Sequence, residues 1–354
     1  MMAANLALGG RGRATIGVLV AVSVFVVGLL WAKWTPYVAK ALKAQRTRHW
    51  SGSSILGVGG VHPGDGPTWH AATTFFTAYV SSIWPALLVA LLISASVQAL
   101  LPRSWLPRAL NRRHVLSSAL AGGAASMPSM MCTCCAAPVA VTLRRNGVSP
   151  TAAIAYWLGN PLLNPAVLVF LFFVAPWQWT LTRAVVGVAT VIGAAVAVGL
   201  VTGARGPRPV APEPIAPPAE KSTGPAPRFV RTLVGLCLIL LPEYAIMVLA
   251  VGAFRGWLLT LTQSPHHGLL IVVIAAIVGT LIVIPTAGEI PILQGLALLG
   301  VSTGTLGALL ITLPVISLPG IAMVTRSFGW KATATATVVV VAGGLAGAAV
   351  LSLL

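Results

Sequence analysis

Apolar stretches of about 20 residues follow one another along the chain, separated by short polar segments. A helix needs about 20 apolar residues to cross the hydrocarbon core of a bilayer. The pattern therefore predicts an all-α polytopic membrane protein with about nine hydrophobic segments. The predicted segments are Ala14–Ala32, Thr73–Leu100, Val115–Leu143, Thr151–Ala175, Leu181–Val201, Val230–Phe254, Gly268–Leu299, Thr303–Val324 and Ala332–Leu354.

The third and seventh stretches are interrupted by prolines and polar residues. The third contains the sequence SMPSMMCTCCAAPVAV, and the seventh contains PTAGEIP. Proline removes a hydrogen bond from a helix interior, so broken or re-entrant helices are expected at both places. The prolines expected to interrupt helices are Pro128, Pro138, Pro161, Pro285, Pro291 and Pro314.

The two halves of the chain have matching sequence patterns. A shift of 153 residues places Pro138 on Pro291, and Gly147 to Ser149 on Gly300 to Ser302. Chance matches of common residues are the alternative explanation. A Pro–Gly–Pro pattern with the same spacings of 9 and 14 residues in both halves favours a true repeat of four segments.

The segment between the halves is rich in proline, alanine and charge, which is typical of a flexible linker. The run Ala14–Ala32 is long for a signal peptide and lacks a small-residue cleavage pattern, so it predicts a retained anchor helix. The predicted organisation has four parts. They are an N-terminal transmembrane helix and basic loop (1–72), a first transmembrane repeat (73–202), the linker (203–229) and a second transmembrane repeat (230–354).

Composition agrees with a membrane location. Hydrophobic residues make up 57% of the chain and charged residues 8%, against about 25% charged in soluble domains. The net charge of +17 raises the question of nucleic-acid binding. However, the basic residues lie in short segments between apolar runs, as the positive-inside rule predicts. The expected partner is the lipid bilayer of the inner or plasma membrane, with no nucleic acid.

Basic residues flank the two interrupted stretches unequally. Four arginines precede the first and two follow it, whereas only Arg255 flanks the second. The two broken segments are therefore predicted to enter from opposite faces, which makes the halves inverted repeats. The basic residues from Lys33 to Arg48 fit this orientation poorly, because it would place them outside. The flanking arginines of the first stretch are Arg103, Arg108, Arg112, Arg113, Arg144 and Arg145.

Three of the four cysteines, Cys132, Cys134 and Cys135, lie just before an expected helix start at Ala136–Pro138. The positive end of a helix favours the thiolate. Thiolates suit Cu(I) or a soft trivalent metalloid, so the three cysteines are predicted metal and substrate ligands. Two alternatives remain open. The cysteines pack as small apolar residues, or they form a redox pair, although the C-x-x-C spacing is missing.

Four further polar residues lie inside apolar sequence. Glu289 occupies the second break at the position that matches Ala136, and a carboxylate at membrane depth marks a functional site. Its alternative role is to pair with the positive end of the following helix. Glu243 serves either proton relay or structural pairing. Asn160 and Asn164 either satisfy backbone groups freed by neighbouring prolines or line a substrate pathway.

Two stretches, PSMMCTCCAAPVAVTLRRNGVSPTAAIAYWLGNPLLNPAVLVF and PTAGEIPILQGLALLGVS, resemble hallmark sequences of a predicted-permease family that includes organoarsenical efflux permeases. The resemblance covers about Lys33 to Phe328. It implies an integral membrane permease whose first-stretch cysteines are functional. In the arsenical exporters these cysteines are associated with trivalent organoarsenicals. Here CTCC is followed by AAP, where many members have a CSC-type stretch, which leaves the substrate open.

The chain has no phosphate loop, zinc-binding H-E-x-x-H or nucleophile elbow, so we expect neither an enzyme nor a resident cofactor. The predicted function is secondary, proton-coupled transport or efflux of a soft, thiol-seeking solute, such as a trivalent metalloid or a soft metal ion. The three cysteines would bind the solute together with Asn160, Asn164 and Glu289, and Glu289 with Glu243 would couple protons. The alternative is a membrane thiol oxidoreductase or a soft-metal-binding protein.

Overall fold

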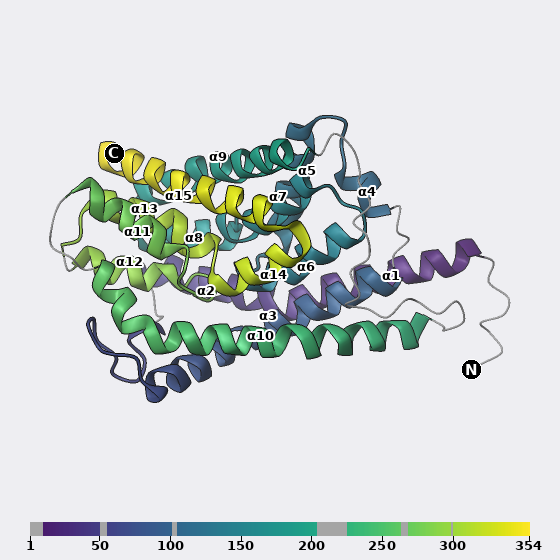
Figure 1. The fold of residues 1–354 in the computed structure, drawn as a ribbon, viewed down its shortest axis with the longest axis horizontal. Coiled ribbons are helices and arrows are strands. Elements are labelled where there is room, and N and C mark those ends of the chain that lie inside the picture. The colour runs from purple at the N-terminus through teal and green to yellow at the C-terminus, as the bar shows by residue number, and fades with distance from the viewer. Residues whose placement is uncertain (1–9, 50–54, 101–104, 204–224, 263–267, 299) are drawn as a thin grey trace.

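The computed structural model describes residues 10–49, 55–100, 105–203, 225–262, 268–298 and 300–354. The described part of the chain is helical and contains no strand (Figure 1). The predicted linker at 203–229 falls mostly outside the described residues. The N-terminal part contains α1 (Gly10–Leu29), the π-helical turn η2 (Leu30–Trp34), α2 (Thr35–Thr47) and the short turn η3 (Ile55–Gly57).

Among the described residues, the two halves that follow contain seven and six α-helices. The first half contains α3 (Trp69–Leu100), α4 (Trp105–Leu110), α5 (Val115–Ser126), η4 (Met127–Ser129), α6 (Thr133–Arg145), α7 (Pro150–Leu162), α8 (Pro165–Val174) and α9 (Trp177–Val201). The second half contains α10 (Pro225–Thr262), α11 (Leu269–Gly279), α12 (Glu289–Leu298), α13 (Thr303–Val315), α14 (Leu318–Phe328) and α15 (Trp330–Leu353).

Among the described residues, five helices are long and apolar enough to cross a bilayer. Helices α13 and α14, bent by 54° at their junction, give a sixth if they are one span. The expected all-α polytopic architecture is confirmed, but the count of nine segments is not. The number of spans is lower than nine partly because both interrupted stretches form helices too short to cross a bilayer. The five spans are Thr15–Thr47, Trp69–Leu100, Pro150–Val174, Trp177–Val201 and Trp330–Leu353.

The first span is longer than the sequence pattern indicated. The helix does not end at Ala32 but continues through η2 and α2 to Thr47. In η2 the backbone N–H of Thr35 donates to the carbonyl of Leu30, one residue further back than in an α-helix. The wider turn lies just before Pro36, which has no N–H to donate. As a result Lys33 lies inside a membrane-length helix.

The two halves share local geometry at matching positions. Gly147 and Gly300, which are 153 residues apart, both adopt a left-handed conformation, with φ of 87° and 80°. Two residues later, Ser149 and Ser302 each cap a helix by accepting a hydrogen bond from the backbone N–H three positions on. The repeat remains a prediction. A true repeat would place matching turns at these positions, as observed.

The directions of the helices fit an inverted relation between the halves. In Figure 1, α3 and α10 lie along each other and run in opposite directions. Helices α9 and α15, which close the two halves, also contact each other and run in opposite directions. The broken pair α5–α6 lies toward one end of the long axis, and α11–α12 lies toward the other. Inversion predicts this arrangement, in which the two breaks enter from opposite faces.

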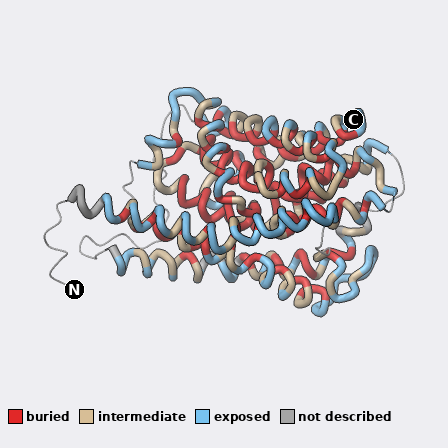
Figure 2. The backbone as a smooth tube through the Cα atoms, turned by 180° about the vertical axis from the view of Figure 1, so that it is seen from behind, coloured by how far each residue is buried: buried red, intermediate tan, exposed pale blue. Residues whose placement is uncertain are grey.

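Buried residues gather in the interior helices, while the outer helices expose one side (Figure 2). The exposed side carries large apolar residues, among them Leu19 and Val27 on α1, Leu238 on α10 and Val338 on α15. Apolar residues on an outer surface are expected where the surrounding solvent is lipid. Inside, helices approach closely at small residues. A Cβ on Gly307 of α13 would collide with the backbone of Gly347 on α15.

Arg255 of α10 is buried and ties the segment after residue 54 and the start of α3 to α10. In the sequence it flanks the second broken stretch, but its guanidinium is surrounded by acceptors. They are the carbonyls of Leu56, Val58, Ala71 and Gly252 and the hydroxyl of Thr74. Arg255 was the one basic residue expected to flank the second broken stretch. Because it is buried, it does not serve as a solvent-facing charge there.

We expect Arg255→Met to lower the thermal unfolding midpoint of the detergent-solubilised protein. The substitution leaves several buried carbonyls without a donor, and each costs about 1–3 kcal/mol. Arg228→Met, at an exposed position of the same helix, is the matched control and should leave the midpoint unchanged. Equal midpoints for the two variants would show that Arg255 does not hold these segments together.

Candidate functional site

The three clustered cysteines lie at the start of α6, immediately after the first break. Cys132 is the N-cap residue, and Cys134 and Cys135 lie in the first turn. The helix begins earlier than the expected Ala136–Pro138, because the N–H of Ala136 already donates to the carbonyl of Cys132 at 3.0 Å. All three side chains are buried, and their Sγ atoms lie within 4.8 Å of one another. The structure thus brings the three thiols together in one cluster.

Two tyrosines that no sequence pattern marked extend the cysteine cluster. The hydroxyl of Tyr79 on α3 is hydrogen-bonded to Sγ of Cys134 at 3.0 Å. The hydroxyl of Tyr244 on α10 donates to Tyr79 at 3.0 Å. Both rings are buried. A hydroxyl chain that contains one residue from each half therefore ends on a thiol.

Lys33 was expected in a loop but lies inside the protein, with 7% of its surface exposed. Its Nζ donates to the hydroxyl of Tyr37 at 2.9 Å and to Oγ1 of Thr286, in the second break, at 3.1 Å. A lysine between two tryptophans in an apolar run is a sequence signal that points to such a position.

The N-terminal span touches both breaks through neighbouring residues. While Lys33 donates to Thr286, the indole Nε1 of Trp34 donates to the carbonyl of Pro128 in η4 at 2.8 Å. The two donors lie next to each other at the end of the π-helical turn. The first span therefore helps to fix the position of both breaks.

Glu289, the first residue of α12, forms a buried ion pair with Arg183 of α9. Nη1 of Arg183 and Oε1 of Glu289 are 2.7 Å apart, and both side chains are almost fully buried. Nη2 of Arg183 also donates to the carbonyl of Pro161 at 2.8 Å. Glu289 was predicted from the sequence and Arg183 was not, although the rule that marks a carboxylate at membrane depth applies equally to a guanidinium.

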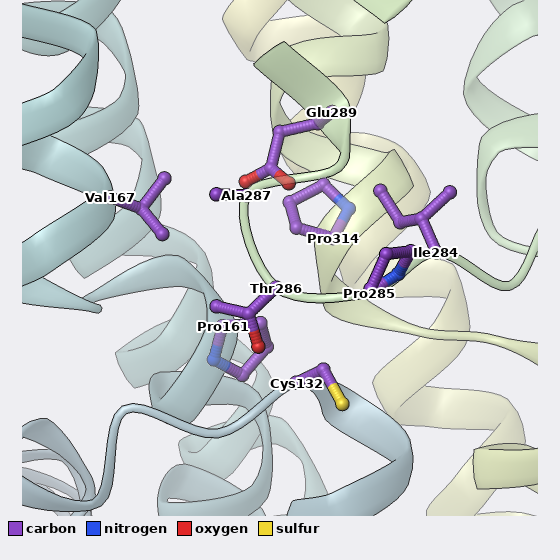
Figure 3. Close-up of a pocket in the computed structure, with 9 residues that line it drawn as sticks. All are labelled: Cys132, Pro161, Val167, Ile284, Pro285, Thr286, Ala287, Glu289 and Pro314. Atoms are coloured by element: carbon purple, nitrogen blue, oxygen red, sulfur yellow. The ribbon is translucent and has the colours of Figure 1, made fainter. Parts of the chain in front are cut away.

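A small cavity lies between the two halves, with a volume of about 10 Å³. This is close to the space needed to centre one water molecule. In Figure 3 the carboxylate of Glu289 points into the space between the halves, and Cys132 lies across it beyond Thr286. The Cys132 sulfur is turned away from Glu289. The lining residues are Cys132, Pro161, Val167, Ile284, Pro285, Thr286, Ala287, Glu289 and Pro314.

The two asparagines make hydrogen bonds that fix the backbone. Oδ1 of Asn160 accepts hydrogen bonds from the hydroxyl of Ser129 and from the N–H of Met131, which lie at the first break. Asn164 caps α8, and its Oδ1 accepts from the N–H groups of the next turn. Neither asparagine lines the cavity. Their contacts are those expected if the amides replace hydrogen bonds lost near the prolines.

The other predicted residues are distributed unevenly around the cavity. Pro161, Pro285 and Pro314 line it, and Pro291 lies in the first turn of α12. Pro128 lies in η4, whereas Pro138 is inside α6 rather than at a break. Glu243 belongs to α10, but its side chain falls outside the described residues.

The sequence model of a family described as "Predicted permease" matches residues 68–353. The chain belongs to this predicted permease family. The match covers both halves and both breaks, while Lys33 and Trp34 lie before it. This permease is also 40% identical over 326 residues to UPF0718 protein YraQ of Escherichia coli (strain K12), with 92% of each chain covered. No solved structure matches it. Family membership and the apolar helices together show a multi-pass membrane protein.

We expect the single variants Arg183→Met and Glu289→Gln each to reduce the yield and thermal midpoint of the permease more than the double variant does. Removing one partner of a buried ion pair leaves an uncompensated charge and costs about 3–5 kcal/mol, whereas replacing both partners is often neutral. Fluorescence-detected size exclusion and thermal unfolding measure the effect. A double variant that loses the sum of the two single effects would show that the pair is not coupled.

Proposed function

We propose that this permease is a secondary transporter that moves a soft, thiol-seeking solute outward, through a site between its two helix breaks. The observation that carries the proposal is the position of the thiol cluster. Three buried thiols lie at a helix start beside a cavity that Cys132 and Glu289 both line. Family membership supports a permease rather than an enzyme.

The thiols supply the affinity in this proposal. Sulfur ligands select soft ions and metalloids over the hard ions that abound in cells. Metal–sulfur bonds are about 2.3 Å long for zinc thiolates, so thiols within 4.8 Å of one another can share one such atom. Cys132, Cys134 and Cys135 are therefore the proposed ligands. Asn160 contributes by holding the first break in place, and Asn164 by capping α8.

In this proposal, transport requires a movement of the two halves around the helix breaks. A cavity of about 10 Å³ is too small to serve as an open path, so the described conformation corresponds to a closed site. The broken pairs α5–α6 and α11–α12 approach the cavity from opposite ends of the bundle. A small rotation of one half against the other would open the site to one face at a time, as in other transporters built from inverted repeats.

Glu289 is the proposed site of proton coupling. In the described conformation its Oε1 lies 2.7 Å from Nη1 of Arg183. A proton taken up by Glu289 would end the pairing and release the contact between α9 and the start of α12. Since α12 follows the second break directly, protonation would act on the cavity wall. Glu243 remains a second proposed coupling residue.

We expect replacement of Cys132, Cys134 and Cys135 by serine to abolish the tolerance of a metal-sensitive host to soft solutes. Serine keeps the approximate volume but loses the soft ligand. The panel comprises Cu(I), Ag(I), arsenite and methylated arsenicals, with uptake into inverted membrane vesicles as the direct measurement. Cys237→Ser, at a half-buried thiol on α10, is the matched control and should keep wild-type tolerance.

The outcome also separates the two classes of function. A triple serine variant that inserts normally and still transports would exclude the thiols as ligands. If the purified wild-type protein instead oxidises a dithiol with a quinone, and the triple variant loses this activity, the membrane oxidoreductase would replace the transporter.

We expect Glu289→Gln to make the transport rate independent of pH. Glutamine keeps the shape of the side chain but cannot take up a proton. Rates are measured in vesicles across a pH series and normalised to the amount of folded protein, because the substitution also breaks the ion pair with Arg183. A variant whose rate follows pH as the wild type does would assign Glu289 to structure alone.

A further inference from the structure

Two buried hydroxyls lie where the first half of the chain meets the second. Thr133 is the first residue of α6, and Ser317 is the N-cap residue of α14. Both are almost fully buried, and neither Oγ1 of Thr133 nor Oγ of Ser317 has a hydrogen-bond partner among the described residues. Buried polar groups without a partner are costly and rare in folded proteins, so each one points to a bound ion, a water or a solute.

The position of these hydroxyls at helix starts explains why no local acceptor serves them. Hydroxyls inside helices donate to the carbonyl four residues back, as Thr312 does to Ala308 and Thr325 does to Ile321. A residue at the start of a helix has no preceding turn that could offer such a carbonyl. The hydroxyl of Thr133 and that of Ser317 are therefore available to a group from outside their own helices.

The residues at matching positions in the other half are hydrogen-bonded. At the shift of 153 residues, Thr133 matches Thr286 and Ser317 matches Asn164. Oγ1 of Thr286 accepts a hydrogen bond from Lys33, and Oδ1 of Asn164 caps α8. Of these four matched positions, Thr133 and Ser317 are thus the two whose hydroxyls no described residue engages.

The two hydroxyls converge on one point beside Gly320, the third residue of α14. A Cβ on Gly320 would lie 3.4 Å from each hydroxyl oxygen and 3.1 Å from Cζ2 of Trp157. Trp157 is buried, and its indole Nε1 donates to the carbonyl of Thr133 at 3.0 Å, which fixes the start of α6. Because residue 320 has no side chain, both hydroxyls can reach the same small space.

The electrostatic potential at this point favours negative charge. Helices α6 and α14 pack against each other (Figure 1) and are 13 and 11 residues long. Each begins at this junction, and a helix N-terminus carries a partial positive charge from its free N–H groups. Neither N-terminus is capped by the side chain of its N-cap residue. Two hydroxyl donors and two helix N-termini are a combination that suits an anion.

We propose that Thr133, Ser317 and Gly320 form a binding site for a small anion where α6 and α14 meet. The anion is a halide or one charged oxygen of a small oxyanion, since hydroxyl donors and helix N-termini recognise both. In transporters with broken helices, the N-termini of half-helices point at anionic groups at the interface between repeats. The site goes beyond the proposed function and does not rest on it, because it uses no thiol and neither Arg183 nor Glu289.

The experiment measures binding of radioactive chloride to the purified full-length protein, with gluconate keeping the ionic strength constant. We expect saturable binding to the wild type. Thr133→Val and Ser317→Ala should each lower the affinity roughly tenfold or more, because each removes a hydrogen-bond donor to a charged group. Gly320→Ala should also lower the affinity, because its methyl group would occupy the space between the two hydroxyls.

Three variants separate binding from folding. Ser317→Thr keeps the hydroxyl and should keep most of the affinity. Thr312→Val removes a buried hydroxyl that bonds within its own helix, so it should leave chloride binding unchanged. Gly320→Ala removes no hydrogen-bonding side chain, and alanine is favoured over glycine inside a helix. It therefore tests the site even if the two hydroxyl variants do not fold.

Thermal unfolding of the wild type distinguishes the two kinds of anion. A ligand that binds only the folded protein raises the unfolding midpoint. A larger rise in bromide than in nitrate assigns the site to a halide, and the reverse assigns it to an oxyanion oxygen. Either rise should be lost in Gly320→Ala.

Two results would overturn the inference. One is the absence of saturable chloride binding together with equal midpoints in bromide, nitrate and gluconate, which would leave water as the partner of the two hydroxyls. The other is equal anion affinity in the wild type, Thr133→Val and Gly320→Ala. Because binding is measured on purified protein, neither result depends on whether vesicles transport a thiol-seeking solute.

Discussion

The need to satisfy broken backbone inside a bilayer governs this structure. Hydrocarbon offers no hydrogen bonds, so N–H and C=O groups at a helix break must find partners within the protein. At the first break, Oδ1 of Asn160 accepts a hydrogen bond from the N–H of Met131, and the indole of Trp34 donates to the carbonyl of Pro128. These partners come from α7 and from the first span. The break between α5 and α6 is therefore stabilised where it meets both of them. The thiols that follow the break are therefore buried at a junction of helices.

Charge is arranged around that junction in two ways. The Arg183–Glu289 pair joins α9 to α12 and is neutral as a unit, so it can lie inside the protein without a ligand. Lys33 is different, because its partners are hydroxyls. The described part of the chain thus holds a buried ion pair and a buried ammonium bound by hydroxyls near the same junction of helices.

The sequence was sufficient for features that depend on neighbours along the chain. Apolar length predicted the membrane helices, the prolines and glycines marked both breaks, and the spacing of the cysteines marked the cluster. Contacts between distant residues were not predictable in the same way. Tyr79 and Tyr244 look like ordinary apolar-run tyrosines until folding places their hydroxyls in one chain that ends on Cys134. Arg183 could have been found by applying to bases the rule that identified Glu289.

The contact between Lys33 and Thr286 joins residues 253 positions apart. At a synthesis rate of about 5–20 residues per second, the ribosome needs roughly 13–50 seconds to make that length of chain. During this interval Lys33 is already part of a completed span, but its acceptor in the second half has not been made. The long side chain can reach the headgroup region meanwhile. Final docking of the first span thus waits for the last third of the chain, and nascent protein truncated before Thr286 should remain open to quality-control proteases.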